Sequence, residues 1–521
     1  MIGKLAWLGW LVGFWIILAL VPEGVVLAGA DGEDARRVAV LGQSDDDDGE
    51  EPDPVDDDDD FEQPAPVDDD DDFEELAPAG DDDDDDFVEP APAGDDDDFV
   101  EPAPVGDDDN DDDDVAAPAP AGDDDNDDDF EQSEPVFADG GGEVDVSLRD
   151  QAIVGLVDGV DPNEFGQRYN LLVERVIPRA NIVLIRLDPN RDNAAELQDL
   201  LDDDDVEWAE LNFTAQAPEG RPRYFFSAVA GVPQVVDLPA LPAGLEFSPD
   251  AACVTGAGVV VAVLDTGIDV DHPALAANVL PNGVNMVDNT YDLRDIGDDL
   301  DDDGDGQTDE MVGHGTHIAG AILQVAPNAG ILPVKVLNSD GVGNAFTVTS
   351  GIYFAVEQGA DAINLSLGST YDSFAIRDAV DFAVSQDVIV VAAVGNGDRL
   401  VPVEFPAAIE TSISVASTTV DADKTSYSNF HPTVEISAPG SNLASAFPGG
   451  LYVTASGSSM STSLVTGNAA LILERQPEAT PEDVIELLQA TSGTLNLSDP
   501  AHEGMLGAGE IDIDASISCA G

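Results

Sequence analysis

The stretch Val261-Ala262-Val263-Leu264-Asp265-Thr266-Gly267 carries the clearest signal for the fold of this chain. Its apolar residues do not alternate with polar ones, which is typical of a strand buried on both faces of a sheet. Similar apolar runs lie at 331–337, 362–367, 388–393 and 411–416, and helix-like segments such as 347–357 and 374–385 separate them. This alternation predicts an α/β fold with a mostly parallel sheet and helices on both faces.

Three motifs with reactive side chains lie at predicted strand or helix ends of this sheet. The quoted strand ends in Asp265, and His314-Gly315-Thr316-His317-Ile318-Ala319-Gly320 opens a helix of small residues. Gly457-Ser458-Ser459-Met460-Ser461 forms a tight turn before an apolar helix at 464–473. A hydroxyl nucleophile needs an imidazole to take its proton, and that imidazole needs a carboxylate to fix its tautomer. The three motifs supply these three groups.

In this order and with these surroundings, the motifs closely resemble those of the subtilisin-like serine proteases. The resemblance covers about residues 245–518 and includes further motifs: Asp271-His272-Pro273-Ala274-Leu275, Val325-Ala326-Pro327, Val334-Lys335-Val336-Leu337 and Gly507-Ala508-Gly509-Glu510-Ile511-Asp512. It implies that Asp265 orients His314, that His314 is the general base, and that Ser459 is the nucleophile.

The resemblance also implies how substrate is held. Gly395-Asn396-Gly397 matches the family's oxyanion-hole position, so the Asn396 amide and the Ser459 backbone N–H are expected to stabilise the tetrahedral oxyanion. The residues Ser366, Leu367 and Gly368 resemble the wall of the pocket for the substrate residue before the scissile bond. A substrate strand is expected to pair with this wall.

Some residues depart from the family pattern or suggest other roles. Ser458 stands where the family usually has Thr, and it keeps a hydroxyl, so we expect activity to survive. His317 is expected to be a packed, structural histidine. His272, His431 and His502 are expected in loops or on the surface. An inactive protein on the same scaffold remains an alternative, because a fold does not guarantee a function.

An acidic loop before His314 predicts a calcium site. Asp301, Asp303, Asp305 and Asp309 alternate with other residues, and Gly306 permits a sharp turn, so the carboxylates are expected to converge on one cation. An EF-hand is excluded because Val312 stands at its twelfth position. The alternative is one more acidic surface loop.

The chain has two cysteines, Cys253 and Cys519, near the two ends of the predicted catalytic domain at 228–521. In an exported protein they most simply form one disulfide, and two unpaired buried thiols are the alternative.

Residues 143–227 predict a small α+β, ferredoxin-like domain before the catalytic domain. The sequence favours strands at 152–158, 181–187 and 206–209, and helices at 162–169 and 193–201. The segment Val206-Glu207-Trp208-Ala209-Glu210-Leu211-Asn212 resembles the closing strand of subtilase propeptides. The resemblance implies a propeptide that assists folding and inhibits the enzyme, with self-cleavage in the link 215–232.

The N-terminal part predicts export. Lys4, an apolar run at 5–21 and Ala28-Gly29-Ala30 match a signal peptide at 1–30, with an uncleaved membrane anchor as the alternative. Residues 31–142 are predicted to be disordered, because 48 acidic side chains and no Lys or Arg lie between positions 45 and 139. This arm is interpreted as a solvated spacer, or alternatively as a weak calcium or mineral-surface binder.

The composition limits the partners. A formal net charge of −93 excludes nucleic acid, which needs clustered Lys and Arg. Together with the predicted signal peptide and acidic loop, the resemblance implies a secreted, calcium-supported serine endopeptidase, made as a zymogen, that acts on proteins or peptides. The alternatives are an inactive binding protein of the same fold and calcium-dependent adhesion through the acidic arm. A membrane partner is expected only if the N-terminal segment stays uncleaved.

Overall fold

The computed structural model describes residues 39–40, 147–220, 228–229, 232–233, 253–400 and 404–517. The predicted signal peptide and nearly all of the acidic arm lie outside these residues. Among the helices that the structure describes, none combines the length and apolar character needed to cross a membrane.

The small domain follows a β-α-β-β-α-β order. Its elements are β2 (Ser147–Leu156), α1 (Pro162–Tyr169), β3 (Leu172–Ile177), β4 (Ile182–Arg186), α2 (Asn193–Leu201) and β5 (Val206–Gln216). Antiparallel pairing puts the strands in the order β5-β2-β4-β3, with the short β1 (Ala39–Val40) beside β5. Asp161 and Asp192 cap the two helices at the bounds that the sequence predicts. The sequence reading missed β3, and it ended β5 too early.

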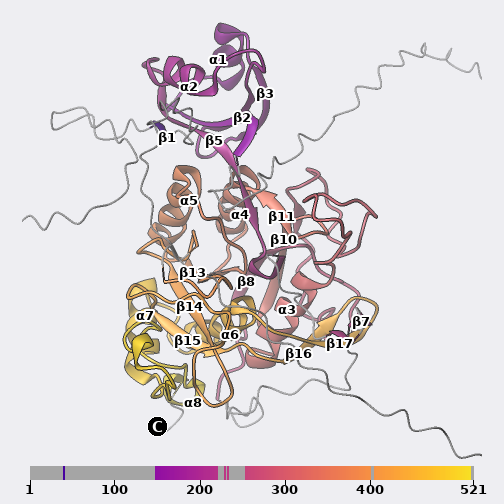
Figure 1. Cartoon of the computed structure of the whole chain (residues 1–521), viewed down its shortest axis with the longest axis vertical. Helices are drawn as coiled ribbons and strands as arrows, with labels where there is room; N and C mark the ends of the chain where they lie inside the picture. Colours follow the sequence, from indigo (N-terminus) through magenta and orange to yellow (C-terminus); the bar gives the residue numbers. More distant parts are fainter. Residues whose placement is uncertain are drawn as a thin grey trace, which may run out of the picture. The chain divides into compact units, whose positions relative to one another are not determined.

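Strand β5 connects the small domain to the larger one. Beyond its pairing with β2, β5 pairs antiparallel with β11 (Val342–Asn344), so that Gln216 lies opposite Val342 (Figure 1). Phe213, Ala215 and Ala217 are buried in this part of the chain. The strand extends past residue 209 because a second strand accepts its hydrogen bonds, which local sequence does not reveal.

The larger domain is built on a seven-stranded parallel sheet, in the order β15-β14-β13-β12-β8-β10-β9. The strands are β8 (Val260–Asp265), β9 (Val284–Asn285), β10 (Gly330–Lys335), β12 (Ala362–Leu365), β13 (Ile389–Ala393), β14 (Ile413–Thr418) and β15 (Ile436–Pro439). Nearly all residues of these strands are buried, as expected for a sheet that helices cover on both faces. The predicted α/β class is confirmed.

Two pairs of long helices pack in this domain (Figure 1). Helix α3 (His314–Val325) packs against α6 (Ser458–Arg475), and α4 (Ala345–Glu357) packs against α5 (Phe374–Ser385). Helix α6 is buried from Ser458 to Leu473, a range that covers its hydroxyl-rich first turns as well as the predicted apolar stretch. It begins at Ser458, six residues before the predicted start, so the predicted tight turn is the first turn of the helix. The remaining elements are η1 (Pro218–Gly220), β6 (Ala228–Val229), β7 (Val232–Pro233), β16 (Leu443–Phe447), β17 (Leu451–Ala455), α7 (Pro481–Thr491), η2 (Pro500–His502) and α8 (Ile513–Ile517).

The topology brings three predicted site segments to one edge of the sheet. Asp265 ends β8, Ser366 follows β12, and Asn396 follows β13. These strands are parallel neighbours, so their carboxyl ends lie together, where open α/β sheets bind ligands.

Candidate active site

Asp265 and His314 form a buried pair. The Asp265 Oδ1 atom lies 2.7 Å from His314 Nδ1 and also accepts a hydrogen bond of 2.8 Å from the Thr266 N–H. Their side chains are 1% and 0% exposed. The helix that carries His314 can approach β8 only because residue 315 is Gly: a Cβ atom there would lie 2.1 Å from the Gly267 carbonyl oxygen.

Asp295, which the sequence reading did not single out, fixes the start of helix α3. Its buried carboxylate accepts hydrogen bonds from the Gly313 N–H at 2.9 Å and from the Thr316 N–H and hydroxyl at 3.1 and 2.6 Å. It also accepts one of 3.1 Å from the Thr266 hydroxyl. Asp295 therefore connects the strand-end turn of Asp265 to the helix of His314. Burial raises the pKa of Asp295 to about 6.

Ser459 lies in the first turn of α6. Its hydroxyl donates to Glu219 Oε2 at 2.9 Å, and the Ser366 carbonyl oxygen lies 3.4 Å from the same Oγ. The Nε2 atom of His314 lies 3.2 Å from Glu219 Oε2. One carboxylate oxygen thus contacts both the predicted nucleophile and the predicted base.

Asn396 contacts the other oxygen of the same carboxylate. Its Nδ2 donates to Glu219 Oε1 at 2.9 Å, and its Oδ1 accepts a hydrogen bond of 2.9 Å from the Ser458 N–H. The Ser458 hydroxyl accepts from the Gly395 N–H at 3.2 Å. The hydroxyl at position 458 therefore bonds the Asn396 loop to helix α6, a role that Thr or Ser can fill.

Glu219 is a second site residue that the sequence reading missed. It belongs to the turn η1 directly after β5, and it is 3% exposed. No motif marks it, because its position depends on how β5 enters the larger domain. Gly457 makes room for it: a Cβ atom there would lie 1.9 Å from Glu219 Oε1.

The charge state of His314 follows from its neighbours. Burial alone would lower its pKa, but the carboxylates of Asp265 and Glu219 raise it to about 10. In contrast, burial and the nearby His314 lower the pKa of His317 to about 3. The Nε2 atom of His317 lies 3.0 Å from the Leu443 carbonyl oxygen, as expected of a packed, neutral histidine.

The segment Ser366-Leu367-Gly368 is buried and pairs with the chain's own strand. Gly368 and Gln216 exchange two backbone hydrogen bonds of 2.9 and 2.8 Å. The next residue, Ala217, donates its N–H to the Gly341 carbonyl oxygen at 2.9 Å. The chain therefore lies extended between two backbone segments, as a peptide does in strand-addition recognition.

Comparison with known proteins agrees with this geometry. The model of the subtilase family matches residues 256–509. An intracellular serine protease of Paenibacillus polymyxa is 36% identical over 262 residues, which are 47% of this chain and 77% of that protein. Subtilisin DY of Bacillus licheniformis is 33% identical over 273 residues, which are 50% of this chain and 91% of that protein. The chain belongs to the subtilase family.

This subtilase is a subtilisin-like serine endopeptidase. Thermitase of Thermoactinomyces vulgaris is 37% identical over 227 residues, 42% of this chain and 75% of thermitase. The crystal structure of fervidolysin from Fervidobacterium pennivorans, a keratinolytic enzyme related to subtilisin, superposes with a TM-score of 0.55. It covers 71% of this chain and 61% of fervidolysin at 21% identity, which shows a shared fold.

The acidic loop of this subtilase gathers three of the four predicted calcium ligands. Among the described residues, carboxylate oxygens of Asp301, Asp303 and Asp305 lie within 4.8 Å of one another. Asp309 is directed elsewhere: its two oxygens accept the N–H groups of residues 298 and 299 at 2.8 and 3.1 Å. Gly306 has a φ of 89° at the turn, as the pattern requires.

Further carboxylates surround this loop. Asp340 is buried and accepts a hydrogen bond of 2.5 Å from the Asp302 N–H. Burial and neighbouring carboxylates raise the pKa of Asp302 and of Asp303 to about 6, and that of Glu310 to about 7. A divalent cation would offset this repulsion, so the donor set fits calcium.

Two remaining predictions concern other residues. Cys253 is disulfide-bonded, and its predicted partner, Cys519, lies outside the described residues. His272, predicted in a loop or at the surface, lies in a loop, and its side chain is buried, with Nε2 3.0 Å from the Leu451 carbonyl oxygen. Its ring meets the Tyr452 ring edge-on, with the ring centres 5.2 Å apart.

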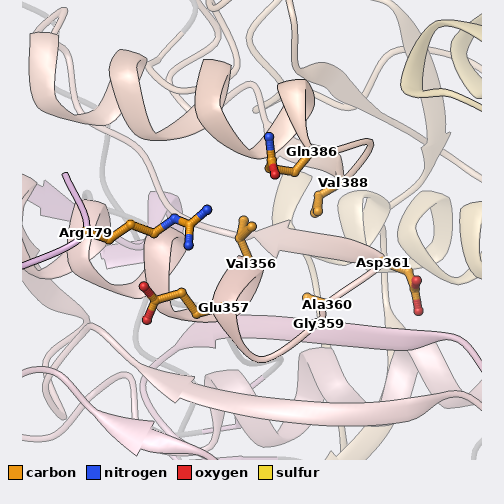
Figure 2. A pocket seen from close by; sticks show the side chains of 8 residues that line it. All are labelled: Arg179, Val356, Glu357, Gly359, Ala360, Asp361, Gln386 and Val388. Carbon is orange, nitrogen blue, oxygen red and sulfur yellow. The ribbon is translucent and has the colours of Figure 1, made fainter.

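A pocket of about 380 Å³ lies apart from the catalytic groups, where the small domain meets the ends of α4 and α5 (Figure 2). The guanidinium of Arg179, in the turn between β3 and β4, lies 5.0 Å from the centre of the Phe382 ring. The pocket therefore belongs to the contact between the two domains. Its lining residues are Arg179, Val356, Glu357, Gly359, Ala360, Asp361, Gln386 and Val388.

Proposed function

We propose that this subtilase cleaves peptide bonds with Ser459 as nucleophile, His314 as general base and Asp265 as the carboxylate that orients it. The observation that carries the proposal is the Glu219 carboxylate, which contacts Ser459, His314 and Asn396 at 2.9, 3.2 and 2.9 Å. Three groups from three different elements converge on one site of negative charge. A tetrahedral oxyanion beside a hydroxyl nucleophile needs this arrangement.

The reaction is an acyl transfer. The Ser459 oxygen attacks the substrate carbonyl carbon while His314 Nε2 takes the hydroxyl proton. The 2.7 Å contact with Asp265 stabilises the imidazolium, and Asn396 Nδ2 and the Ser459 N–H donate to the oxyanion. His314 then protonates the leaving amine, and a water activated by the same imidazole hydrolyses the acyl-enzyme.

We further propose that the small domain is a propeptide and that the described chain is the inhibited zymogen. The pairing of Gln216 with Gly368 occupies the backbone that a substrate strand would use. The Glu219 carboxylate fills the space between base, nucleophile and oxyanion donor. The carbonyl of a separate substrate is then excluded while the segment stays. Self-cleavage within 215–232 requires the Glu219 carboxylate to give its place to a carbonyl of the same segment, and it would then release the segment.

Two side chains of β5 support this role of the small domain. Buried Glu210 accepts hydrogen bonds at the start of α5, from the Ser373 hydroxyl at 2.7 Å and from the N–H groups of residues 374 and 375 at 2.8 and 3.0 Å. Asn212 Oδ1 accepts the Phe346 N–H at 3.2 Å, in the first turn of α4. Both contacts satisfy helix N–H groups that otherwise have no partner within the helix.

Calcium binding and secretion complete the proposal. Asp301, Asp303 and Asp305 would hold a calcium ion, which supplies positive charge to the loop that leads into helix α3.

Secretion rests on the N-terminal sequence pattern alone. Expression with and without residues 1–30, followed by assay of medium and cells, tests it: equal amounts in the medium would contradict the signal peptide.

The test of the catalytic proposal is intact mass after expression in calcium-containing medium, for the unmodified chain and for Ser459→Ala. We expect only the unmodified chain to lose roughly 200 N-terminal residues, with a new N-terminus within 215–232. Ser463→Ala, which changes a buried hydroxyl on the same helix, is the matched control and should still process. If both the unmodified chain and Ser459→Ala stay full length while folded, self-processing is wrong and the inactive-scaffold reading gains support.

A further inference from the structure

A buried carboxylate, Glu404, lies between the two backbone segments that flank the nucleophile. A Cβ atom on Gly368 would lie 2.4 Å from Glu404 Oε2, and one on Gly395 would lie 2.8 Å from Oε1. Gly368 belongs to the segment that pairs with β5, and Gly395 precedes Asn396. The two glycines leave the space that the carboxylate enters, and Glu404 is 8% exposed.

The backbone holds Glu404 in this position from both sides. Its N–H donates to the Val394 carbonyl oxygen at 3.4 Å, and the next residue, Phe405, exchanges two hydrogen bonds of 2.8 Å with Ser369. Residue 404 is therefore anchored to the Asn396 loop and, through its neighbour, to the segment 366–369. These bonds fix the backbone of residue 404 and therefore the point from which its side chain extends.

The gap is the place where a substrate side chain would enter, an inference that rests on the proposed function. The chain's own strand passes Gly368 at Gln216, so a substrate in the same register reaches Ser366 next. The Ser366 carbonyl oxygen lies 3.4 Å from Ser459 Oγ, which puts that substrate residue at the scissile bond. Its side chain has the wall 366–368 on one side and the loop 394–396 on the other.

We propose that Glu404 selects substrates with Lys or Arg immediately before the scissile bond. A carboxylate that is 8% exposed between these two backbone segments attracts an ammonium or guanidinium group strongly, because little water screens the pair. Arg can bond both carboxylate oxygens at once. Neutral side chains would form no ion pair with the carboxylate, and acidic side chains would meet a like charge.

The surroundings favour the same substrates. Residues 228–521 carry 40 acidic and six basic side chains, so the domain attracts cationic peptides before contact.

Two basic side chains lie near the residues that flank Glu404. Arg377 is paired with Asp372 at 2.5 Å, with its guanidinium 5.8 Å from the centre of the Phe405 ring. Arg399 lies beside Gly397: a Cβ atom added to Gly397 would lie 3.1 Å from Arg399 Nε.

The direct test measures kcat/KM of the processed enzyme on peptides that differ only in the residue before the scissile bond: Lys, Arg, Gln, Leu or Glu. We expect the Lys and Arg peptides to exceed the Leu and Gln peptides by about tenfold or more. Glu404→Gln should lower the Lys and Arg values by about 10–100-fold and leave the neutral ones within about threefold. Glu478→Gln, an exposed acidic residue of the same domain, is the matched control and should change neither.

A second measurement needs no variant. Benzamidine, a planar cation, should inhibit the unmodified enzyme competitively and about tenfold more tightly than its neutral analogue benzamide. This comparison tests the proposed role of Glu404 even if Glu404→Gln does not fold. Equal inhibition by the two compounds would overturn the proposal.

The outcomes separate pocket specificity from catalysis. If Glu404→Gln lowers kcat/KM for all five peptides in equal proportion, Glu404 only supports the fold of the site. An unmodified enzyme that cleaves Leu or Glu peptides as well as Lys and Arg peptides would also overturn the proposal, while leaving the proposed protease intact. An enzyme that cleaves none of the peptides after processing would contradict the proposed function itself.

Discussion

The Glu219 carboxylate accepts a hydrogen bond of 2.9 Å from the Ser459 hydroxyl. Residues 219 and 459 lie 240 positions apart, in a turn after the small domain and in the first turn of the buried helix α6. The same side chain contacts His314 and Asn396, so one residue engages the proposed nucleophile, base and oxyanion donor together. Release of this contact is therefore expected to control when the enzyme becomes active.

Replacement of Glu219 by Gln should shorten the lag before activity appears by about tenfold or more. A Gln side chain has one acceptor oxygen, so its NH₂ group would face a donor of Asn396, Ser459 or His314. The measurement is the time course of peptide cleavage after refolding of the full chain in calcium. Glu207→Gln, at an exposed position of strand β5, which precedes Glu219, should keep the original lag. An unchanged lag in Glu219→Gln would show that backbone pairing alone holds the segment.

The contact between Glu219 and His314 should weaken as the pH rises. The pKa of His314 is about 10 in the described zymogen, above its ordinary value of 6.5. The imidazolium therefore stabilises the bound segment fully below pH 6.5, and this stabilisation is lost as the pH rises through 10. Glu210 acts in the same direction at lower pH: burial raises its pKa from 4.5 to about 7, so its contribution is lost mainly between these two values. We expect the small domain to dissociate more readily at pH 9–10 than at pH 6.

A proton NMR titration of full-length Ser459→Ala checks this prediction through the His314 Nδ1 proton. The downfield resonance should persist well above pH 8 and should titrate at lower pH once Glu219 is also replaced by Gln. A titration midpoint near pH 6.5 in both proteins would contradict the assigned contact.

Replacement of Asn396 by Ala should lower kcat by about 10²–10³ with little change in KM, because its Nδ2 would bond an oxyanion that exists only in the transition state. The side chain also accepts the Ser458 N–H, so thermal unfolding must be measured alongside. Steady-state kinetics of the processed enzyme distinguish the roles. A large rise in KM at constant kcat would assign Asn396 to ground-state binding instead.

Calcium removal should lower the unfolding temperature, and substitutions of Asp301 and Asp309 should change this effect in different ways. Asp301→Asn is expected to weaken the dependence on calcium, since the three clustered carboxylates would share the ion. Asp309→Asn is expected to lower the unfolding temperature while calcium still raises it, because Asp309 holds the backbone at residues 298 and 299. Thermal scans with calcium and with a chelator test both. Identical behaviour of the two variants would argue against the assignment.

The helices and buried strands could be predicted from the sequence because each depends on local pattern. Helices α1 and α2 have an Asp cap at the residue where the sequence changes to a helical pattern. Strands β8 and β13 are runs of apolar residues, which only a sheet covered on both faces requires. Strand β3 was missed because its residues are mostly half-exposed, with two exposed positions, so the apolar pattern is weak.

The sequence by itself determined the family, the α/β class and the candidate triad, since Asp265, His314 and Ser459 lie in motifs whose neighbours are contiguous in the chain. Only the tertiary structure decided the places of Asp295, Glu219 and Glu404. Each acts on a segment that only folding brings to it: Asp295 on helix α3, Glu219 on Ser459, and Glu404 between Gly368 and Gly395. A carboxylate in an acidic chain has no distinguishing local pattern, and its role follows from the donors and cavities that folding brings around it.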